Sequence, residues 1–437
     1  MNTPHHTLPA TGSPVPPSSD PASTDLPTPL WRLLAPICGM VFLQFFAMGL
    51  PLAVLPVHVA GVLGYSSLMV GIVVGAQSVV TLLTRHRSGT RTDTRGPRDA
   101  VTLGLRVSVA SGVAYLAALS VRDATGALVL LLVARGLLGL GESLVIVGGL
   151  AWSMALAGRQ RSGLVMAWVG IAMYGGIAAG APVGTALTGL AGFRAAAVAA
   201  TIVPLAGIPL ARLARSVRVS PGPSATLRSI TRSILLPGTA LALATVSFGA
   251  IAGFSALMYE ARGWSHSAAP LTAFGIAYIA ARLLFGGLPD RFGGARVALG
   301  SIAVTALGQA AMWTAPSPGV AAAAAALTGA GFSLTFPSLG ILAMEHVPPH
   351  NRGVALGAYV AFFDATMGLG IPALGAVVST LGYRSAYLGG LLSAVASLTL
   401  VATPQVRAWR TSDGLATRAL TTTGSAEAHF AITTEEA

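Results

Sequence analysis

The chain alternates between long apolar runs and short polar breaks over most of its length. A helix that spans a membrane needs about 20 mainly apolar residues, and runs of this size recur from residue 32 to residue 403. We expect twelve helices, at 32–59, 66–84, 100–120, 125–156, 163–189, 193–211, 234–258, 268–287, 295–313, 318–345, 353–379 and 384–403. The pattern therefore predicts an all-α polytopic membrane protein.

The polar breaks divide the chain into two halves of six helices. The break at 212–233 is the longest internal polar segment, and it contains several arginines and a Pro-Gly-Pro turn. We predict an N-terminal lobe at 31–211, a basic cytoplasmic linker at 212–233 and a C-terminal lobe at 234–403. The polar ends, 1–30 and 404–437, are expected to be disordered tails, and the first lacks the basic and apolar regions of a signal peptide.

Composition excludes several other classes of protein. Only 9% of the residues are charged and 54% are hydrophobic, whereas a soluble domain is about 25% charged. The net charge of +12 would favour nucleic acid only if it gathered on a solvated domain, and the pattern predicts none. The single cysteine, Cys38, excludes a disulfide within the chain and a thiolate metal cluster. The lipid bilayer is the expected partner, and nucleic acid is not.

The distribution of arginines predicts the orientation in the membrane. Only Arg122, Arg194, Arg262 and Arg384 fall on the side opposite the two ends of the chain, and most of the others fall on the side of the ends. The positive-inside rule then places both termini in the cytoplasm. All 26 Lys and Arg residues are arginines, which indicates GC-rich bacterial coding and hence the bacterial inner (plasma) membrane.

Three blocks of the first half recur in the second. The stretch RHRSGTRTDTRG at 85–96 corresponds to RLLFGGLPDRFG at 282–293, with four matches 197 residues apart. They pair Arg85, Gly89, Asp93 and Gly96 with Arg282, Gly286, Asp290 and Gly293. A shift of 190 pairs Gly139, Gly141, Ser143, Gly163, Gly180 and Pro182 with Gly329, Gly331, Ser333, Gly353, Gly370 and Pro372. Two duplicated halves with a substrate site between them are typical of secondary transporters.

These motifs resemble those of the major facilitator superfamily. The pattern R-x-x-x-G-x-x-x-D-x-x-G between the second and third helices looks like its signature loop, and ARGLLGLGESL at 134–144 resembles its fourth-helix motif, with Arg135 in the expected place. The glycines and proline of the fifth helix resemble a motif associated with antiporters: Gly170, Gly175, Gly180, Pro182 and Gly184. The resemblance covers about residues 30–405 and favours the drug- and sugar-efflux branch. The chain departs from that branch in its first helix, which offers Gln44 instead of an acidic residue.

The resemblance implies a cytoplasmic gate and a bent fifth helix. The gate would consist of two copies: Arg85, Gly89, Asp93, Arg95 and Gly96, and Arg282, Gly286, Asp290 and Gly293. Gly89 and Gly96 are expected to shape a tight turn, and Asp93 is implied to lock the lobes through charge pairing or the N-terminal dipole of helix eleven. We expect Asp93→Asn to impair switching more than Asp290→Asn does. Small residues allow close helix approach and a proline bends a helix, which predicts a bend formed by Gly176, Gly180, Pro182 and Gly184.

Few ionisable residues fall within the predicted spans, and these are the candidates for coupling. Arg135 and Glu142 are seven residues apart on one helical face, so they form either a structural ion pair or part of a site for protons or substrate charge. Asp364 is a substrate counter-charge, a second proton site or a cap at a kink near Gly368 or Gly370. At the 190-residue shift these three fall on neutral residues, which favours function over shared scaffold. Gln44, Gln77 and Gln309 either line a cavity or pack helices.

The sequence therefore predicts a secondary active transporter that exports a small organic solute. We expect a drug-like compound, sugar or metabolite to leave by proton antiport with alternating access, with the proton gradient as energy source and without cofactor or metal. The alternatives are a proton-coupled importer of a small nutrient and a non-transporting membrane receptor. A membrane enzyme is disfavoured, because we find no metal-ligand cluster and no nucleophile–base set. We expect a monomer.

Overall fold

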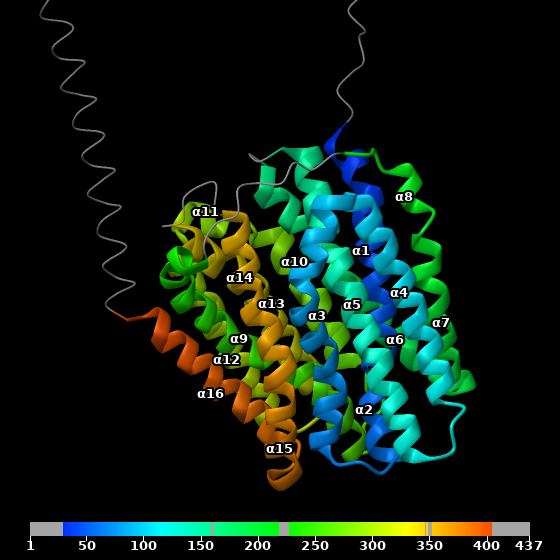
Figure 1. Ribbon diagram of the computed structural model, residues 1–437. Helices are drawn as coiled ribbons and strands as arrows, with labels where there is room; N and C mark the ends of the chain where they lie inside the picture. The colour runs from blue at the N-terminus through cyan, green and yellow to red at the C-terminus, as the bar shows by residue number, and fades with distance from the viewer. Residues whose placement is uncertain (1–28, 159–160, 218–226, 346, 348–351, 404–437) are drawn as a thin grey trace, which may run out of the picture.

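The computed structural model describes residues 29–158, 161–217, 227–345, 347 and 352–403, and all of its regular elements are helices (Figure 1). The first half comprises α1 (Leu30–Leu52), α2 (Leu55–Val57), η1 (His58–Val62), α3 (Ser67–Arg95), α4 (Pro97–Ala118), α5 (Ala124–Ala157), α6 (Ser162–Ala191), α7 (Phe193–Gly207) and α8 (Leu210–Leu213). The second comprises α9 (Leu227–Ala261), α10 (Ala269–Phe285), α11 (Leu288–Phe292), α12 (Gly294–Thr314), α13 (Pro318–Glu345), α14 (Arg352–Ala365), η4 (Thr366–Gly370), α15 (Ile371–Leu381) and α16 (Arg384–Val401). The predicted tails and residues 218–226 of the predicted linker lie outside the described residues.

The helices confirm the predicted fold class. Within the described ranges, eleven helical segments are long and apolar enough to cross a membrane, and α10 is an apolar helix of 17 residues. At about 1.5 Å per residue, α10 reaches about 26 Å, close to the thickness of a bilayer's hydrocarbon core. Each of the twelve predicted runs overlaps one of these helices. Helices suit this environment because they satisfy their backbone hydrogen bonds internally.

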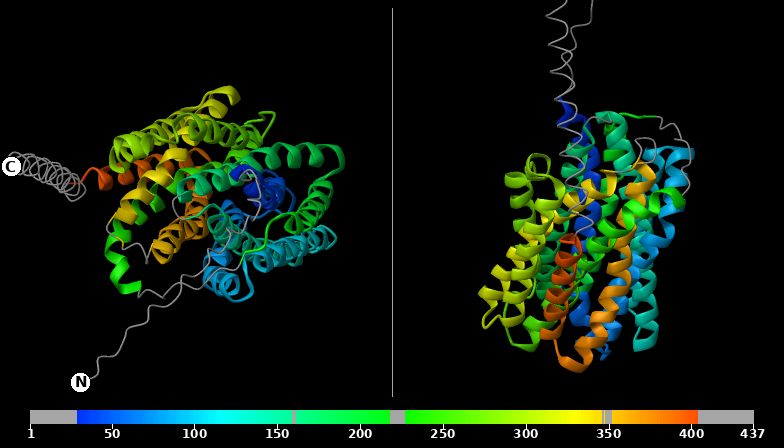
Figure 2. Two further views of the ribbon diagram at one scale, coloured as in Figure 1. Left: turned by 90° about the horizontal axis from the view of Figure 1, so that it is seen from above. Right: turned by 90° about the vertical axis from the view of Figure 1, so that its left-hand side faces the viewer.

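The helices form two bundles that lie side by side (Figures 1 and 2). Within the first half the main packing pairs are α1 with α6, α3 with α5 and α4 with α5 and α7; within the second they are α10 and α12 with α13, and α9 and α12 with α16. Between the halves, α3 packs on α15 and α6 packs on α10. We call the two bundles the first and second lobes.

The repeat seen in the sequence recurs as matching contacts in the two lobes. A Cβ added at Gly141 would lie 2.8 Å from the carbonyl oxygen of Gly104, and one added at Gly331 would lie 2.6 Å from that of Ser301. Ser301 follows Gly104 by the same 197 residues found in the sequence. The α4–α5 and α12–α13 pairs therefore use equivalent positions to bring their backbones together.

The predicted second span ends too early. The apolar run stops near residue 84, but α3 continues to Arg95 and ends at Gly96, whose φ of 90° is accessible mainly to glycine. The last turns of α3 are polar, and an ion pair of 2.7 Å from Arg91 Nε to Asp99 Oδ2 fastens them to α4. Hydropathy marks where a helix leaves lipid, and it does not mark where the helix ends.

Two of the described spans contain a π-helical turn, the first near its end and the eleventh near its middle. The first contains Pro51 and Pro56, which lack a backbone N–H and separate α1 from α2 and the π-helical turn η1. The eleventh runs through α14, the π-helical turn η4 and α15. Such turns are rare and are often found at functional sites, and η4 begins two residues after Asp364.

Candidate functional site

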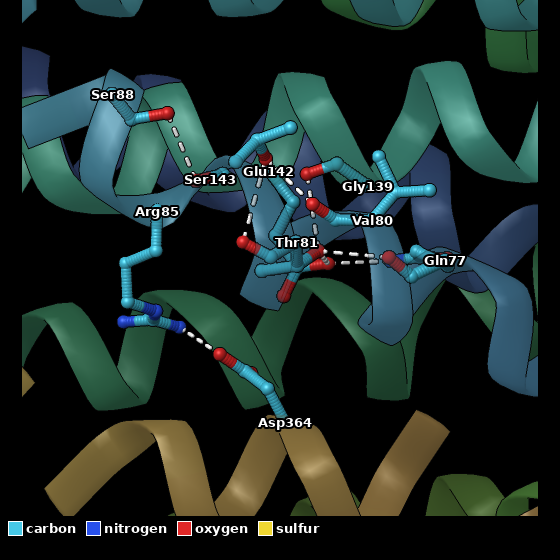
Figure 3. Close-up of polar contacts among 10 residues, drawn as sticks. Gln77, Val80, Thr81, Arg85, Ser88, Gly139, Glu142, Ser143 and Asp364 are labelled. Atoms are coloured by element: carbon cyan, nitrogen blue, oxygen red, sulfur yellow. Dashed lines mark hydrogen bonds and ion pairs between the residues drawn. The ribbon is translucent and has the colours of Figure 1, made fainter. Parts of the chain in front are cut away.

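An ion pair joins the two lobes in the middle of the bundle. Arg85 Nη2 of α3 donates to Asp364 Oδ2 of α14 (Figure 3). The Asp364 side chain is only 4% exposed and that of Arg85 is 17% exposed. The two residues are 279 positions apart in the chain, so only the packing of the lobes brings them together.

Glu142 lies next to this pair and is held by α3. Gln77 Nε2 donates to Glu142 Oε2 at 2.6 Å, and Thr81 Oγ1 lies 3.3 Å from the same oxygen (Figure 3). Gln77, Thr81 and Arg85 are spaced by four residues and therefore share one face of α3. Glu142 is close enough to Arg85 and Asp364 for their charges to interact. This face of α3 connects all three charged groups, which we call the charged cluster.

Arg135 and Glu142 do not form the ion pair that was one of the two alternatives. Arg135 is 1% exposed and donates to the carbonyl oxygens of Val73 at 3.2 Å and Val74 at 2.6 Å. The two side chains contact different residues of α3, because Glu142 accepts from Gln77 and Thr81 instead. The side chain of Arg135 therefore holds α5 against the backbone of α3, while Glu142 belongs to the charged cluster.

Aromatic rings in the second lobe occupy the positions that correspond to the polar contacts of Glu142. The repeat places Gln77, Thr81 and Glu142 opposite Phe274, Tyr278 and Phe332. The ring centroids of Phe274 and Phe332 lie 6.1 Å apart, and Phe248 lies 5.1 Å from Phe274. The two lobes therefore share one packing plan but present a polar, acidic face and an aromatic face.

Tyr174 connects this aromatic face to the first lobe. We call each place where the two lobes meet a seam. Tyr174 belongs to α6 of the first lobe, yet its ring stacks on that of Tyr278 with a centroid distance of 3.8 Å. Arg282 lies at the same seam, where its Nη2 donates to the Tyr278 hydroxyl at 3.1 Å. Tyr174 and Arg282 are the repeat counterparts of Asp364 and Arg85. Equivalent positions thus lie where the lobes meet in both places, but the ring contact joins Tyr174 to Tyr278, the counterpart of Thr81.

The residues of the predicted gate are spread over a longer distance than a single turn. Gly89 lies inside α3, where an added Cβ would meet nothing within 4 Å, so the expectation that it shapes a tight turn is wrong. Only Gly96 forms that turn, because the helix continues through the polar residues before it. Asp93 and Arg95 are exposed, and Asp93 makes no hydrogen bond or ion pair with another described residue. Its proposed role as a lock stays a prediction.

The copy of the gate in the second lobe is built differently. Arg282 ends in the seam, Gly286 follows α10, and Asp290 lies exposed in the first turn of α11. Gly293 has a φ of 83°, close to the 90° of its counterpart Gly96. The turn is therefore shared by the two copies, while the helix before it is continuous in one and broken in the other.

The fifth-helix glycines form a close contact with the first helix. A Cβ at Gly176 would lie 2.6 Å from the carbonyl oxygen of Phe42, and additions at Gly180 and Gly184 would fall on the backbone of the next turns of α1. Helix α6 is assigned without a break across Pro182. The glycines therefore serve tight packing between two helices, and the predicted bend stays a prediction.

The three glutamines differ in their surroundings. Gln44 accepts a hydrogen bond of 2.8 Å from Ser108 Oγ on α4. Gln309 donates to the Ser247 carbonyl and the Thr328 hydroxyl, both at 3.3 Å. For these two the structure favours the packing alternative. Of the three, only Gln77 contacts the charged cluster, through its hydrogen bond to Glu142.

A cavity of about 510 Å³ lies between α1, α6 and α10, in the half of the bundle nearer the termini. Its wall includes Cys38 and Phe42 of α1, Trp168 of α6 and Ile279 of α10, and no charged residue. Among the described residues, no group of three or more His, Cys, Asp or Glu side chains is placed to hold a metal ion.

Comparison with known proteins identifies the family. A family model described as Major Facilitator Superfamily matches residues 37–270 and 237–427. The chain belongs to the major facilitator superfamily. It is a multi-pass membrane transporter rather than an enzyme. The relatives described next are also named as transporters.

Two curated relatives match most of the chain. An uncharacterized MFS-type transporter of Salmonella typhimurium is 39% identical over 363 residues, which cover 80% of this chain and 91% of the relative. One of Burkholderia pseudomallei is 40% identical over 367 residues, covering 83% of this chain and 90% of the relative. They place the chain within the superfamily and name no substrate.

Solved structures of superfamily members share the fold. The human organic anion transporter MFSD10 superposes with a TM-score of 0.67 at 14% identity, covering 86% of this chain and 100% of that one. The nucleoside transporter NupG superposes with a TM-score of 0.66 at 15% identity, covering 84% and 98%. At these identities the likeness concerns the fold alone.

Sequence reasoning missed the contacts that cross the seam. Arg85 was assigned to the gate and Asp364 to coupling, and nothing in either motif pairs them. The aromatic contact between Tyr174 and Tyr278 was not foreseen either. The repeat held a signal, because it aligns Asp364 with Tyr174 and Arg85 with Arg282. The counterparts of the ion pair therefore lie close together where the lobes meet a second time, and both contact Tyr278.

Proposed function

We propose that this transporter exports a small organic solute across the bacterial inner membrane by proton antiport. The observation that carries the proposal is the charged cluster, in which an ion pair between the lobes lies beside a second carboxylate. Charged groups inside a membrane protein are costly and usually mark ion or substrate pathways. Both carboxylates lack an acidic counterpart in the other repeat, which argues against a purely structural role.

The coupling follows from the chemistry of the pair. A proton on Asp364 removes its negative charge and weakens its attraction to Arg85, so the two lobes lose one of their contacts. A proton on Glu142 changes the charge beside that pair. Protons and solute then bias the same equilibrium between two conformations, each through its different affinity for them. Alternating access by a monomer, with both termini in the cytoplasm as the arginines predict, completes the proposal.

Transport in proteoliposomes tests the proposal. Vesicles with an imposed pH gradient are supplied with labelled benzoate, uridine, glucose or tetraphenylphosphonium, one solute at a time. We expect one class of solute to accumulate in exchange for protons. Asp364→Asn and Glu142→Gln should lose this accumulation but keep solute–solute exchange, because each fixes one protonation state. Glu260→Gln, at an exposed carboxylate near the end of α9, is the matched control.

Each other outcome contradicts a defined part of the proposal. Mutants with unchanged pH dependence would remove both carboxylates as proton carriers. Movement of solute together with protons would identify the importer instead. Solute binding without any flux would support the receptor.

A further inference from the structure

The guanidinium of Arg282 lies where the two lobes meet and has no carboxylate partner among the described residues. Its Nη2 donates to the Tyr278 hydroxyl at 3.1 Å, and its guanidinium carbon lies 5.6 Å from the centre of that ring. Its Nε is buried and has no hydrogen-bond partner. No described Asp or Glu lies within ion-pair distance. A buried donor left unsatisfied is unfavourable, and a guanidinium has the fork geometry that suits a carboxylate.

The other seam contains an example of what an arginine binds at this position. Arg85 is the repeat counterpart of Arg282, and it holds the carboxylate of Asp364. The counterpart of Asp364 is Tyr174, which is neutral. The guanidinium of Arg282 lies against the helix of Tyr174, since a Cβ at Gly170 would be 3.8 Å from its Nη2. Arg85 therefore has an anion supplied by the chain itself, whereas the part of the chain that the structure describes supplies none to Arg282.

We infer that Arg282 binds the anionic group of the transported solute, and that the solute is an organic anion with an aromatic or apolar body. This inference rests on the proposed transport function and names its substrate class. The carboxylate of the solute takes the place at Arg282 that Asp364 takes at Arg85. The solute then makes a contact between the lobes that the chain itself lacks.

The surroundings of Arg282 suit the body of such a molecule. The stacked rings of Tyr174 and Tyr278 lie beside the guanidinium. Ile279, one helical turn before Arg282, borders the uncharged cavity of about 510 Å³. Binding sites for small molecules are mostly apolar, have volumes of about 300–1,000 Å³ and contain a few polar groups that fix orientation.

An organic cation fits these groups less well. Glu142, the carboxylate of the cluster that is outside the ion pair, already accepts hydrogen bonds from Gln77 and Thr81. Asp364 is neutralised by Arg85. The Nε atoms of Arg85 and Arg282 are both buried without a hydrogen-bond partner, but among the described residues only Arg85 has a carboxylate partner, so the unmet demand at Arg282 is for a negative group.

Matched pairs of solutes test the inference with the purified full-length protein. Each aromatic carboxylate is compared with its own carboxamide, beginning with labelled benzoate and benzamide, which differ in charge and little in shape. The wild-type protein should bind the carboxylates about tenfold or more tightly than the carboxamides, as expected for charge-assisted hydrogen bonds. In Arg282→Gln this ratio should fall to about one.

A second pair of variants leaves Arg282 in place. Tyr174→Asp introduces a carboxylate at the counterpart of Asp364 and should abolish the preference by occupying Arg282. Tyr174→Asn removes the same ring without adding a charge and should keep the preference. These two variants decide the question even if Arg282→Gln does not fold.

The inference is overturned by a wild-type protein that binds carboxamides as tightly as carboxylates, or binds neither. It is also overturned by a preference that survives in both Arg282→Gln and Tyr174→Asp. The proposed transport function is judged separately, because flux of uridine, glucose or tetraphenylphosphonium would uphold it while excluding an anion as the substrate. Absence of flux for every solute would reject the transport function itself.

Discussion

Gly71 of α3 is the position at which a single methyl group should separate the two lobes. An added Cβ would lie 2.7 Å from the carbonyl oxygen of Ile371 and 2.8 Å from the Cα of Pro372, both on α15. These neighbours are backbone atoms, so no side chain can rotate away. Gly71→Ala therefore forces α3 and α15 apart at the end of the bundle away from the termini.

The magnitude follows from the overlap. Ordinary contact begins at about 3.4 Å, so the helices must separate by several tenths of an ångström. Overpacking of this kind typically costs about 1–3 kcal/mol. If the other conformation lacks this contact, the equilibrium between the two changes by about 5- to 150-fold. The described conformation should lose population by that factor.

Cys38 provides the assay because it is the only cysteine in the chain and borders the cavity between α1, α6 and α10. When the lobes separate at the end of the bundle away from the termini, they should approach each other at the opposite end. The cavity lies in that half of the bundle and should therefore become narrower. We expect a water-soluble maleimide to label Cys38 more slowly in purified Gly71→Ala than in wild type. Gly300→Ala is the matched control, because a Cβ there meets nothing within 4 Å. Equal labelling rates in two folded variants would refute the reasoning.

Three further predictions concern single contacts. Asp364→Asn should reduce proton-driven transport at least tenfold, because the side chain can no longer exchange a proton. Loss of one partner of a buried pair also leaves the other charge uncompensated, so this variant should have a lower melting temperature, and adding Arg85→Gln should restore part of that stability; no recovery of stability in the double variant would argue against the pair. Gly184→Ala should lower the melting temperature, because its Cβ would fall on the α1 backbone at a cost of about 1–3 kcal/mol; an unchanged temperature would contradict this packing. Gly96→Ala should destabilise the protein by about 1–3 kcal/mol because residue 96 has a φ of 90°. Gly89→Ala, in an open helical position, should leave the stability unchanged or raise it slightly. A lower melting temperature for Gly89→Ala than for Gly96→Ala would reject the turn at Gly96.

The spans could be predicted from sequence because lipid imposes a simple requirement, a long apolar run. The same requirement explains the error at α3, where the helix continues in water beyond the last apolar residues. The sequence repeat also predicted the turn at Gly96 and its counterpart Gly293. Both positions have a positive φ that favours glycine, so the same residue occurs in both copies.

The centre of the site could be predicted only in part. Glu142 and Asp364 stand out because charges are rare in apolar helices. Their partners do not, because Arg85 lies at the edge of a motif rich in arginine and Gln77 is neutral. A contact between residues in different lobes depends on how two bundles meet, and local pattern does not encode that.

The contact of α6 with α1 has a consequence for biogenesis. Gly176, Gly180 and Gly184 face the carbonyls of Phe42, Phe46 and Leu50, and each pair is separated by the same 134 positions. The ribosome therefore completes three further spans after α1 before it makes α6. Until α6 has entered the bilayer, α1 lacks its main packing partner, and the lobe that is made first during synthesis cannot form this contact before its fifth span arrives. A truncation before residue 176 should yield an inserted but unpacked chain that is exposed to membrane quality-control proteases.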